Sequence, residues 1–290
     1  METNISLDRF VEILTNEANN LPTEKFDYPS GSKKFNSNDW YDIIFKLLTE
    51  FYPDNKYLIY LKKEETDLTG GKCWLNPIFK EKYVSNLTLI EFESLYPNII
   101  CLLYKERKLI FNNDKIGDLY CDLVALRPEI KKLQLKIAES GQDVSIIEKI
   151  NLLMKLLINY FYGVLSISDE KLSKYNYTNP LFYCNDFGKI NKYIRCLLDT
   201  IIEGFENHIA YIDTDEIFIY DDGVINDIEE IISYSNLPYD KEIGLEGYFT
   251  EKKHFMIFKN KKIIRLRGIK EYNPIRNMKI LRNKFIIKTK

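Results

Sequence analysis

The chain has 290 residues, of which 45% are hydrophobic and 29% charged, and its formal net charge is −2. It is long enough to bury a sizeable core, and its composition is that of a globular protein rather than of a disordered or fibrous one. The sequence has no apolar run of about 18 residues, no signal-peptide core and no CxxC pair among its five cysteines, which argues against a membrane partner and a zinc site and favours a reducing, cytoplasmic setting.

The first third of the chain combines helical and strand patterns. Apolar spacing predicts helices within residues 1–67, followed by a turn at Gly70 and Gly71. An apolar strand, Leu87–Ile90, then leads into an acidic segment, and Pro97 indicates a break before a helix that begins near Asn98.

The middle of the chain is predicted to be helical. A basic helix is expected from Pro128 to about Ala138, with Pro128 in its first turn. A long helix from Val144 to Tyr162 follows after a glycine-containing loop, so the two form an antiparallel hairpin. A further helix, Lys189–Glu203, precedes a second strand region. Strands and helices mixed in this order predict an α+β architecture.

A short acidic hairpin, Tyr211–Glu216, lies between two apolar stretches. Because alternate residues of a strand point to opposite faces, Asp213 and Asp215 are expected on one side of a tight turn. Carboxylates held together in this way repel one another unless a cation lies between them, which indicates a divalent-metal site. Taken alone, the same residues are more typical of a solvated β-turn.

Positive charge is concentrated at the C-terminal end. Residues 252–290 contain fourteen Lys or Arg and a single acid, Glu271, a balance of +13, so the rest of the chain carries −15. A basic segment on an acidic body suits a phosphate backbone, although a solvated tail has the same composition. The interleaved apolar residues between Phe255 and Leu266 favour an ordered pair of strands.

Cations also recur on the predicted helix pair. Lys155, Asn159 and Tyr162 are spaced i, i+4 and i+7 and therefore share one face. Arg127 and Lys131 lie four residues apart at an expected helix start, where backbone N–H groups also favour anions. Carboxylates facing such cations suit a metal-bound triphosphate, whereas the polar stripe by itself is typical of a solvent-facing helix.

Five segments, in order, resemble the sequence motifs of family B DNA polymerases. The run Glu91–Ile100 is similar to their motif A, D-F-x-S-L-Y-P-S-I-I, and Tyr211–Glu216 is similar to motif C, Y-x-D-T-D-S. Lys155–Gly163 resembles the fingers motif, K-x-x-x-N-S-x-Y-G. The other two matches are the Gly-Gly turn before motif A and the pair formed by Lys252–Phe255 and Arg267–Ile269. Together they cover roughly residues 68–270.

The resemblance implies transfer of a deoxynucleotide from a dNTP to a primer 3′ end. Glu91 and Asp215 would be the principal ligands of two Mg²⁺ ions, or of Mn²⁺ in their place. The backbone carbonyl of Phe92 would be a further ligand, and Asp213 would lie close by. These residues would make up the catalytic centre.

The same resemblance implies binding roles for further residues. Ser94 and Leu95 would offer backbone N–H groups to the triphosphate, and Tyr96 would pack under the sugar and exclude a 2′-hydroxyl. The triphosphate would be held by Arg127, Lys131 and Lys155, and the nascent base pair by Asn159, Tyr162 and Gly163. Primer–template DNA would be held by Gly70, Gly71, Lys252, Lys253, Arg267, Gly268 and Lys270.

The resemblance also implies a division of the chain. The expected regions are an N-terminal helical region (1–67), a first palm segment (68–120), fingers (121–165), a second palm segment (166–250) and a basic thumb remnant (251–290). No exonuclease motifs are identifiable in the sequence, so we expect a minimal polymerase without proofreading, of the kind a virus or mobile element encodes. One half of a split polymerase, completed by a second chain, is an equally open interpretation.

The sequence departs from the family pattern at two acidic positions. Glu91 stands where the family has Asp, and a shift of about 1 Å in a catalytic group can lower a rate about 10²-fold. Glu216 replaces a Ser, and we expect its side chain to point to solvent. In addition, Arg127 precedes Pro128, which disfavours a helical conformation at Arg127.

Three functions are compatible with these observations. The first is an active DNA-directed DNA polymerase, and the second is a catalytically impaired relative that binds nucleic acid or a partner chain. The third is a nucleotidyltransferase that works without a template. Glu91 is the main argument for the second, whereas the intact pair Asp213 and Asp215 favours the first.

Overall fold

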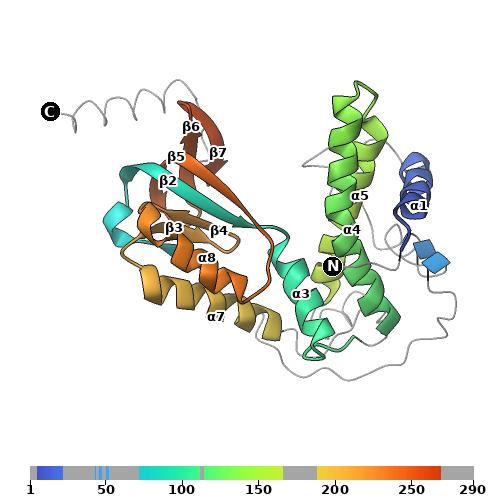
Figure 1. Cartoon of the computed structure of the whole chain (residues 1–290), viewed down its shortest axis with the longest axis horizontal. Helices are drawn as coiled ribbons and strands as arrows, with labels where there is room; N and C mark the ends of the chain where they lie inside the picture. Colours follow the sequence, from blue (N-terminus) through green and yellow to red (C-terminus); the bar gives the residue numbers. More distant parts are fainter. Residues whose placement is uncertain are drawn as a thin grey trace. The chain divides into compact units, whose positions relative to one another are not determined.

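The structure, a computed structural model, describes residues 5–21, 72–111, 114–165 and 188–268, together with residues 43, 46, 47, 50 and 51 (Figure 1). The chain divides into two compact units, the first made of Met1–Gly70 and Ser94–Tyr193 and the second of Gly71–Glu93 and Ile194–Lys290. Within the described ranges, no helix is long and apolar enough to cross a membrane. The predicted turn at Gly70 and Gly71 lies outside the described residues, as does Lys270.

Helices make up most of the described residues of the first unit. It contains α1 (Leu7–Asn20), α3 (Leu95–Lys105), α4 (Asp114–Glu139) and α5 (Ser145–Leu165). Helices α4 and α5 pack side by side as an antiparallel hairpin, as predicted, and α1 packs against α5 (Figure 1). Helix α3 belongs to this unit, whereas the sequence placed its residues in the palm.

Helix α4 begins much earlier than the sequence indicated. It starts at Asp114, so Pro128 lies in its interior rather than in its first turn, and Arg127 is helical. Both expectations for this segment were therefore wrong. The helix continues through the proline because its apolar face is buried both before and after Pro128, at Leu126 and at Ile130. Packing of an apolar face outweighs a local backbone preference.

Helix α3 begins at Leu95, three residues before the predicted start. Its N-cap, Ser94, has a left-handed conformation with φ 47° and ψ 49°. Leu95 and Tyr96 are the first two helical residues, whose N–H groups have no acceptor within a helix. Pro97 follows as the third residue, where a missing N–H removes no helical hydrogen bond. The break expected at Pro97 is thus the first turn of the helix itself.

The second unit is built on one antiparallel sheet of seven strands in the order β1-β3-β4-β2-β5-β6-β7. The strands are β1 (Cys73–Leu75), β2 (Lys82–Phe92), β3 (Ile209–Asp213), β4 (Glu216–Ile219), β5 (Tyr239–Glu251), β6 (His254–Lys259) and β7 (Lys262–Arg267). Two short 3-10 turns are present: η3 (Pro77–Phe79) lies between β1 and β2, and η4 (Asp222–Val224) lies between β4 and α8. Strands β6 and β7 confirm the ordered strand pair predicted in the basic segment, and the whole confirms the α+β class.

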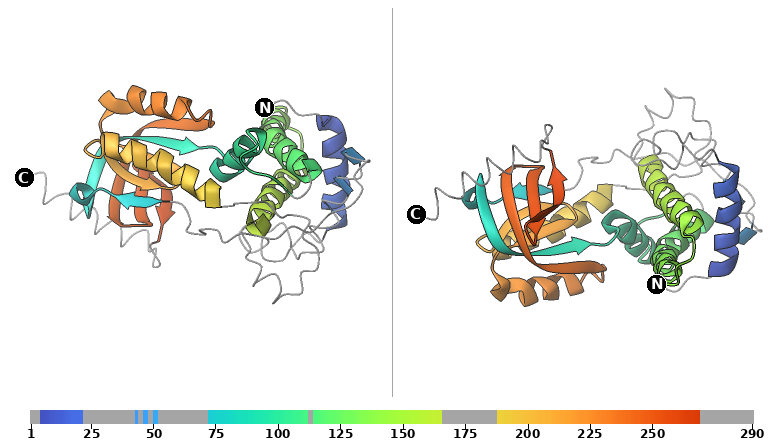
Figure 2. Two further views of the ribbon diagram at one scale, coloured as in Figure 1. Left: turned by 90° about the horizontal axis from the view of Figure 1, so that it is seen from below. Right: turned by 90° about the horizontal axis from the view of Figure 1, so that it is seen from above.

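One face of the sheet is covered by helices. Helices α7 (Gly188–Phe205) and α8 (Ile225–Ser233) lie on the same side of it (Figure 2). Ile90, Ile212 and Ile217 alternate with the residues of the other face and are fully buried. Helix α7 agrees with the prediction for 189–203 to within two residues at each end.

The other face of the sheet holds an aromatic cluster formed by Tyr211, Phe218, Phe249 and Phe255. The ring centroids of Tyr211 and Phe255 are 5.2 Å apart. In a flat sheet, β3 and β6 would be separated by four strand spacings, or about 19 Å. The sheet must therefore curl strongly over this face. That curl carries β7 towards the ends of β2, β3 and β4.

Candidate active site

Three carboxylates form a row across the ends of three neighbouring strands. Glu91 on β2 is the register partner of Glu216 on β4, which in turn is paired with Asp213 on β3. Strand alternation places all three on the face that carries the aromatic cluster, because each lies two residues from a member of that cluster or of its surrounding core. Asp213 and Glu216 are only 3% and 8% exposed.

The position of Glu216 corrects the sequence prediction. We expected this side chain to point to solvent, but it is buried and bonded to Arg265. The reason is its strand parity: Glu216 opens β4 two residues before Phe218, which points into the cluster. The sequence allowed this conclusion only if the first residue of β4 was known.

Asp215 lies in the turn between β3 and β4, and backbone hydrogen bonds hold that turn in place. The Phe92 N–H donates to the Asp215 carbonyl at 2.8 Å, and the Thr214 N–H donates to the Lys72 carbonyl at the same distance. Thr214 has a φ of 60°, in the left-handed region typical of a tight hairpin. The turn thus joins the end of β2, so the described structure places Glu91, Asp213 and Asp215 at one end of neighbouring strands.

Two arginines of β7 are ion-paired to this row. Arg265 bonds the carboxylates of both Glu91 and Glu216, with 2.5 Å between its Nη2 and Glu91 Oε2. Arg267 bonds Asp213 at 2.5 Å. Sequence reasoning assigned Arg267 to DNA and overlooked Arg265. The available signal was the i, i+2 spacing of two arginines on a predicted strand, but the curl of the sheet that brings them here was not predictable.

Asp215 differs from its neighbours because, within the described residues, it forms no ion pair. Burial raises the pKa of its carboxyl above the ordinary value, and the negative charges of Glu91 and Asp213 add to the rise. Burial also raises the pKa of Glu216, whose Oε2 has no hydrogen-bond donor among the residues that the structure describes. The site therefore has more negative charge than the two arginines compensate.

The donor chemistry of these residues fits a hard divalent cation. Carboxylate oxygens and a backbone carbonyl are the ligands that Mg²⁺ prefers, and the uncompensated carboxylate of Asp215 is the kind of group that such an ion stabilises. In the portion of the chain that the structure describes, however, no three acidic, histidine or cysteine side chains converge as a ready-made metal cage. Arginine contacts, rather than a shared centre, orient Glu91, Glu216 and Asp213 in this arrangement.

The predicted nucleotide-binding residues lie in the first unit, and two contacts join four of them. Arg127 Nη1 donates to Ser94 Oγ at 2.8 Å, linking α4 to the N-terminus of α3. The rings of Tyr96 and Tyr162 are in edge contact, with centroids 4.8 Å apart. Burial raises the pKa of Tyr162, and the adjacent phenol of Tyr96 adds to the effect. These contacts bring α3, α4 and α5 together around the predicted sugar-packing tyrosine.

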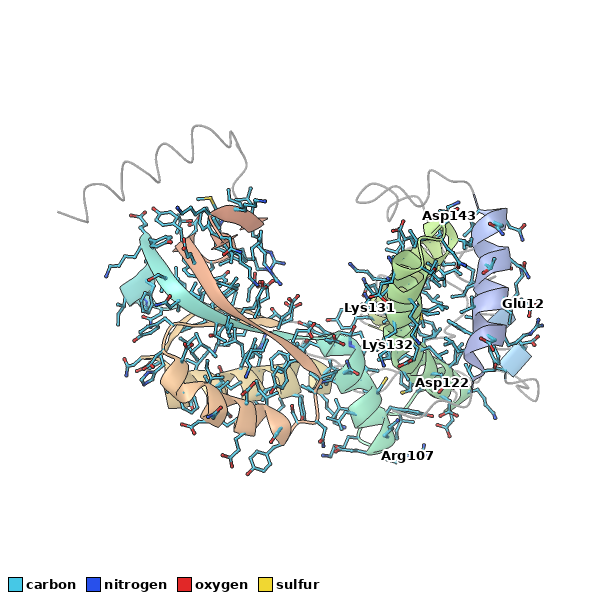
Figure 3. The ribbon with its side chains drawn as sticks, turned by 45° about the horizontal axis from the view of Figure 1, so that its top comes forward. Glu12, Arg107, Asp122, Lys131, Lys132 and Asp143 are labelled. Carbon is cyan, nitrogen blue, oxygen red and sulfur yellow. The ribbon has the colours of Figure 1, made fainter. Side chains whose placement is uncertain are left out.

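The remaining predicted nucleotide-binding residues are placed by their helices. Lys155 and Asn159 are exposed on α5, and Lys131 is exposed along α4 (Figure 3). Because α4 begins at Asp114, the helix N-terminus expected at Arg127 and Lys131 is absent there, and only their side chains are available to an anion. Leu95 is buried at the start of α3, and Gly163 lies near the end of α5.

The predicted DNA-binding residues of the second unit gather at the turn between β5 and β6. Lys252 and Lys253 form this turn, and the Lys253 N–H donates to the hydroxyl of Tyr211 at 2.7 Å. Gly268 has a φ of +72°, and a Cβ at this position would collide with the Lys253 carbonyl oxygen and the His254 ring. Only glycine allows this approach of the end of β7 to the turn.

Tyr211→Phe is expected to lower the free energy of unfolding by about 1–2 kcal/mol. The substitution keeps the buried ring but leaves the Lys253 N–H without its acceptor and removes the contact of 3.1 Å between the hydroxyl and Cys73 Sγ. Urea unfolding followed by circular dichroism measures the difference. Tyr234→Phe, at a tyrosine that is 78% exposed, is the matched control and should change the stability little. Equal stabilities of the Tyr211 variant and the unchanged protein would contradict the role of this hydroxyl.

The second unit carries acidic side chains at the ends of the central strands of its antiparallel sheet, and the first unit contains a hairpin of two long helices. With these elements the chain has a polymerase-like fold. The chain is similar in structure to the family B DNA polymerase from the hyperthermophilic archaeon Pyrobaculum calidifontis, with a TM-score of 0.53 and 14% sequence identity. The match covers 98% of this chain and 39% of that polymerase. At this identity the likeness shows the fold, and no family model or curated protein matches the sequence.

Proposed function

We propose that the chain acts as a DNA-directed DNA polymerase that adds deoxynucleotides to a primer 3′ end. The observation that carries the proposal is the row of carboxylates beside the half-buried Asp215, which forms no ion pair among the described residues, on a polymerase-like sheet. Glu91, Asp215 and the Phe92 carbonyl would hold two Mg²⁺ ions. Such ions activate a primer hydroxyl and neutralise a leaving pyrophosphate.

The helical unit supports the nucleotide aspect of the proposal. Arg127, Lys131 and Lys155 offer three cations that suit a triphosphate, and the N–H groups in the first turn of α3 suit its oxygens. Tyr96 and Tyr162 offer an aromatic surface for the sugar and base. A deoxynucleoside triphosphate matches this combination of charge and ring surface.

The basic strand pair supports the DNA aspect. Lys252, Lys253 and Arg267 lie at one end of β5, β6 and β7, and Lys261 and Lys262 are exposed at the opposite turn of the hairpin. Their charges suit contact with a phosphate backbone whatever the sequence of the DNA.

Primer extension on a short primed DNA template tests the proposal. Mg²⁺ and Mn²⁺ are supplied in turn, with dNTPs or rNTPs, and a reaction without template tests for end extension without templating. Incorporation that follows the template supports the polymerase, whereas incorporation without a template supports the template-independent nucleotidyltransferase. No incorporation under any of these conditions would overturn the catalytic proposal.

One observation favours a second function, that of a non-catalytic subunit that binds nucleic acid. The pairing of Arg265 with Glu91 and Glu216 neutralises two acids without an ion. A protein in which Arg265 stays paired with Glu91 and Glu216 would bind duplex DNA with a strong salt dependence and would extend no primer. Fluorescence anisotropy with labelled DNA, run beside the extension assay, separates the two functions.

A further inference from the structure

The two acidic departures from the polymerase motifs meet at one side chain. Glu91 replaces an Asp and Glu216 replaces a Ser, and the two are direct register partners on β2 and β4. Both carboxylates bond the same guanidinium, that of Arg265 on β7. Glu91 is long enough to reach that arginine, and Ser at position 216 would offer it no charge. Glu91 and Glu216 together thus form a clasp, a pair of carboxylates that holds the guanidinium of Arg265.

This clasp is partly open to solvent. The side chains of Arg265 and Glu91 are 28% and 37% exposed, whereas that of Glu216 is 11% exposed. Both partners of the Arg265–Glu91 pair are partly exposed, so solvent weakens the pair and an entering phosphate can compete with Glu91 for the guanidinium. Arg265 also lies on the most basic strand of the sheet, next to Arg267 and in line with Lys262.

Arg265 and a divalent cation would use the same oxygens. A guanidinium bonded to Glu91 holds the carboxylate that is predicted to bind the metal, and its charge repels a second cation at that position. Asp215 is outside the clasp and forms no ion pair among the described residues, although the charge of Arg267 acts on its carboxyl. In this arrangement Arg265 covers one proposed metal ligand, Glu91, and leaves the other, Asp215, uncovered.

We propose that Arg265 is a tethered cation that covers Glu91 and Glu216 until a DNA phosphate draws it away, so that DNA binding and metal binding are coupled. The inference rests on the proposed function, because it takes Glu91 and Asp215 as metal ligands. Coupling of this kind is reciprocal: DNA tightens metal binding by the same factor by which the metal tightens DNA binding. The result is a metal centre that is completed when a duplex is present.

Mn²⁺ binding to the full chain, followed by the electron paramagnetic resonance signal of free Mn²⁺, tests the proposal without any activity measurement. Without DNA, Arg265→Gln is expected to bind Mn²⁺ about tenfold more tightly than the unchanged protein, because one competing charge is removed. A short DNA duplex should tighten Mn²⁺ binding by the unchanged protein and have a much smaller effect on the variant. The matched control is Lys82→Gln, an exposed lysine of β2 outside the proposed DNA and metal sites, which should behave like the unchanged protein.

Equal or weaker Mn²⁺ binding by Arg265→Gln would overturn the inference. If Asp215→Asn still abolishes Mn²⁺ binding in that case, the proposed metal site stands and only the role of Arg265 fails. If Asp215→Asn has no effect on Mn²⁺ binding, the proposed site and the inference fail together. Should Arg265→Gln not fold, the double variant Arg265→Gln with Glu216→Ser removes the unpaired buried carboxylate, and it is compared with Glu216→Ser alone for the same tenfold difference.

Discussion

Replacing Asp215 by Asn is expected to lower primer-dependent nucleotide incorporation by about 10³-fold or more. The side chain keeps its shape but loses the charge that a divalent ion would compensate. Asp215 forms no ion pair among the described residues, and its carboxyl is subject to the like charges of Glu91, Asp213 and Glu216 and to the opposing charge of Arg267. Single-turnover extension of a labelled primer, with Mg²⁺ and then Mn²⁺, measures the loss.

The same substitution should leave the melting temperature unchanged or raise it. A carboxyl whose pKa is raised in the folded protein is harder to ionise there than in the unfolded chain, so above both pKa values its charge destabilises the fold. Asn removes that charge. Loss of incorporation with retained stability therefore separates a catalytic role from a structural one.

Asp227→Asn is the matched control for Asp215→Asn. It removes the same charge from an exposed position on α8, so both incorporation and stability should stay close to those of the unchanged protein. If Asp215→Asn extends primers at the rate of the unchanged protein, the assignment of Asp215 to a metal site is wrong.

Local patterns of the sequence were sufficient to predict much of the fold. The helical hairpin of α4 and α5, helix α7 and the strand pair β6 and β7 follow from apolar periodicity, which reports directly on which face of an element is buried. The start of α4 was missed because Pro128 suggests a helix N-terminus, whereas tertiary packing extends the helix well before it.

The sequence indicated three acidic residues of the candidate site, but neither the arginines that contact them nor the burial of Glu216. Strand pairing places Glu91, Asp213 and Asp215 near one another, and the order of the polymerase-like motifs along the chain was enough to suggest this pairing. The roles of Arg265 and Glu216 depend on the curl of the sheet and on the parity of β4. Both are properties of long-range packing, and a shift of one residue in register would reverse the direction of every side chain.

Tyr96→Ala is expected to reduce the preference for dNTPs over rNTPs by about 10²-fold, the scale on which the shape of a pocket discriminates a single added hydroxyl. Tyr96 is the second residue of α3, and its ring is held by edge contact with Tyr162 on α5. A ring fixed in this way is suited to exclude a 2′-hydroxyl by its volume. The ratio of kcat/KM for dCTP and CTP, measured opposite a template guanine, gives the preference directly.

Two further variants test whether the preference for dNTPs depends on the Tyr96 ring and on its contact with Tyr162. Tyr96→Phe keeps the aromatic volume and should retain the preference, whereas Tyr162→Leu removes the edge contact and should produce a smaller loss than Tyr96→Ala because the gating ring is still present. Full discrimination by Tyr96→Ala would contradict the steric role and leave the ring as a packing element between α3 and α5. A loss in Tyr96→Phe equal to that in Tyr96→Ala would instead assign the selectivity to the phenol hydroxyl, because a site that reads a hydrogen bond discriminates by the polar atom and not by volume.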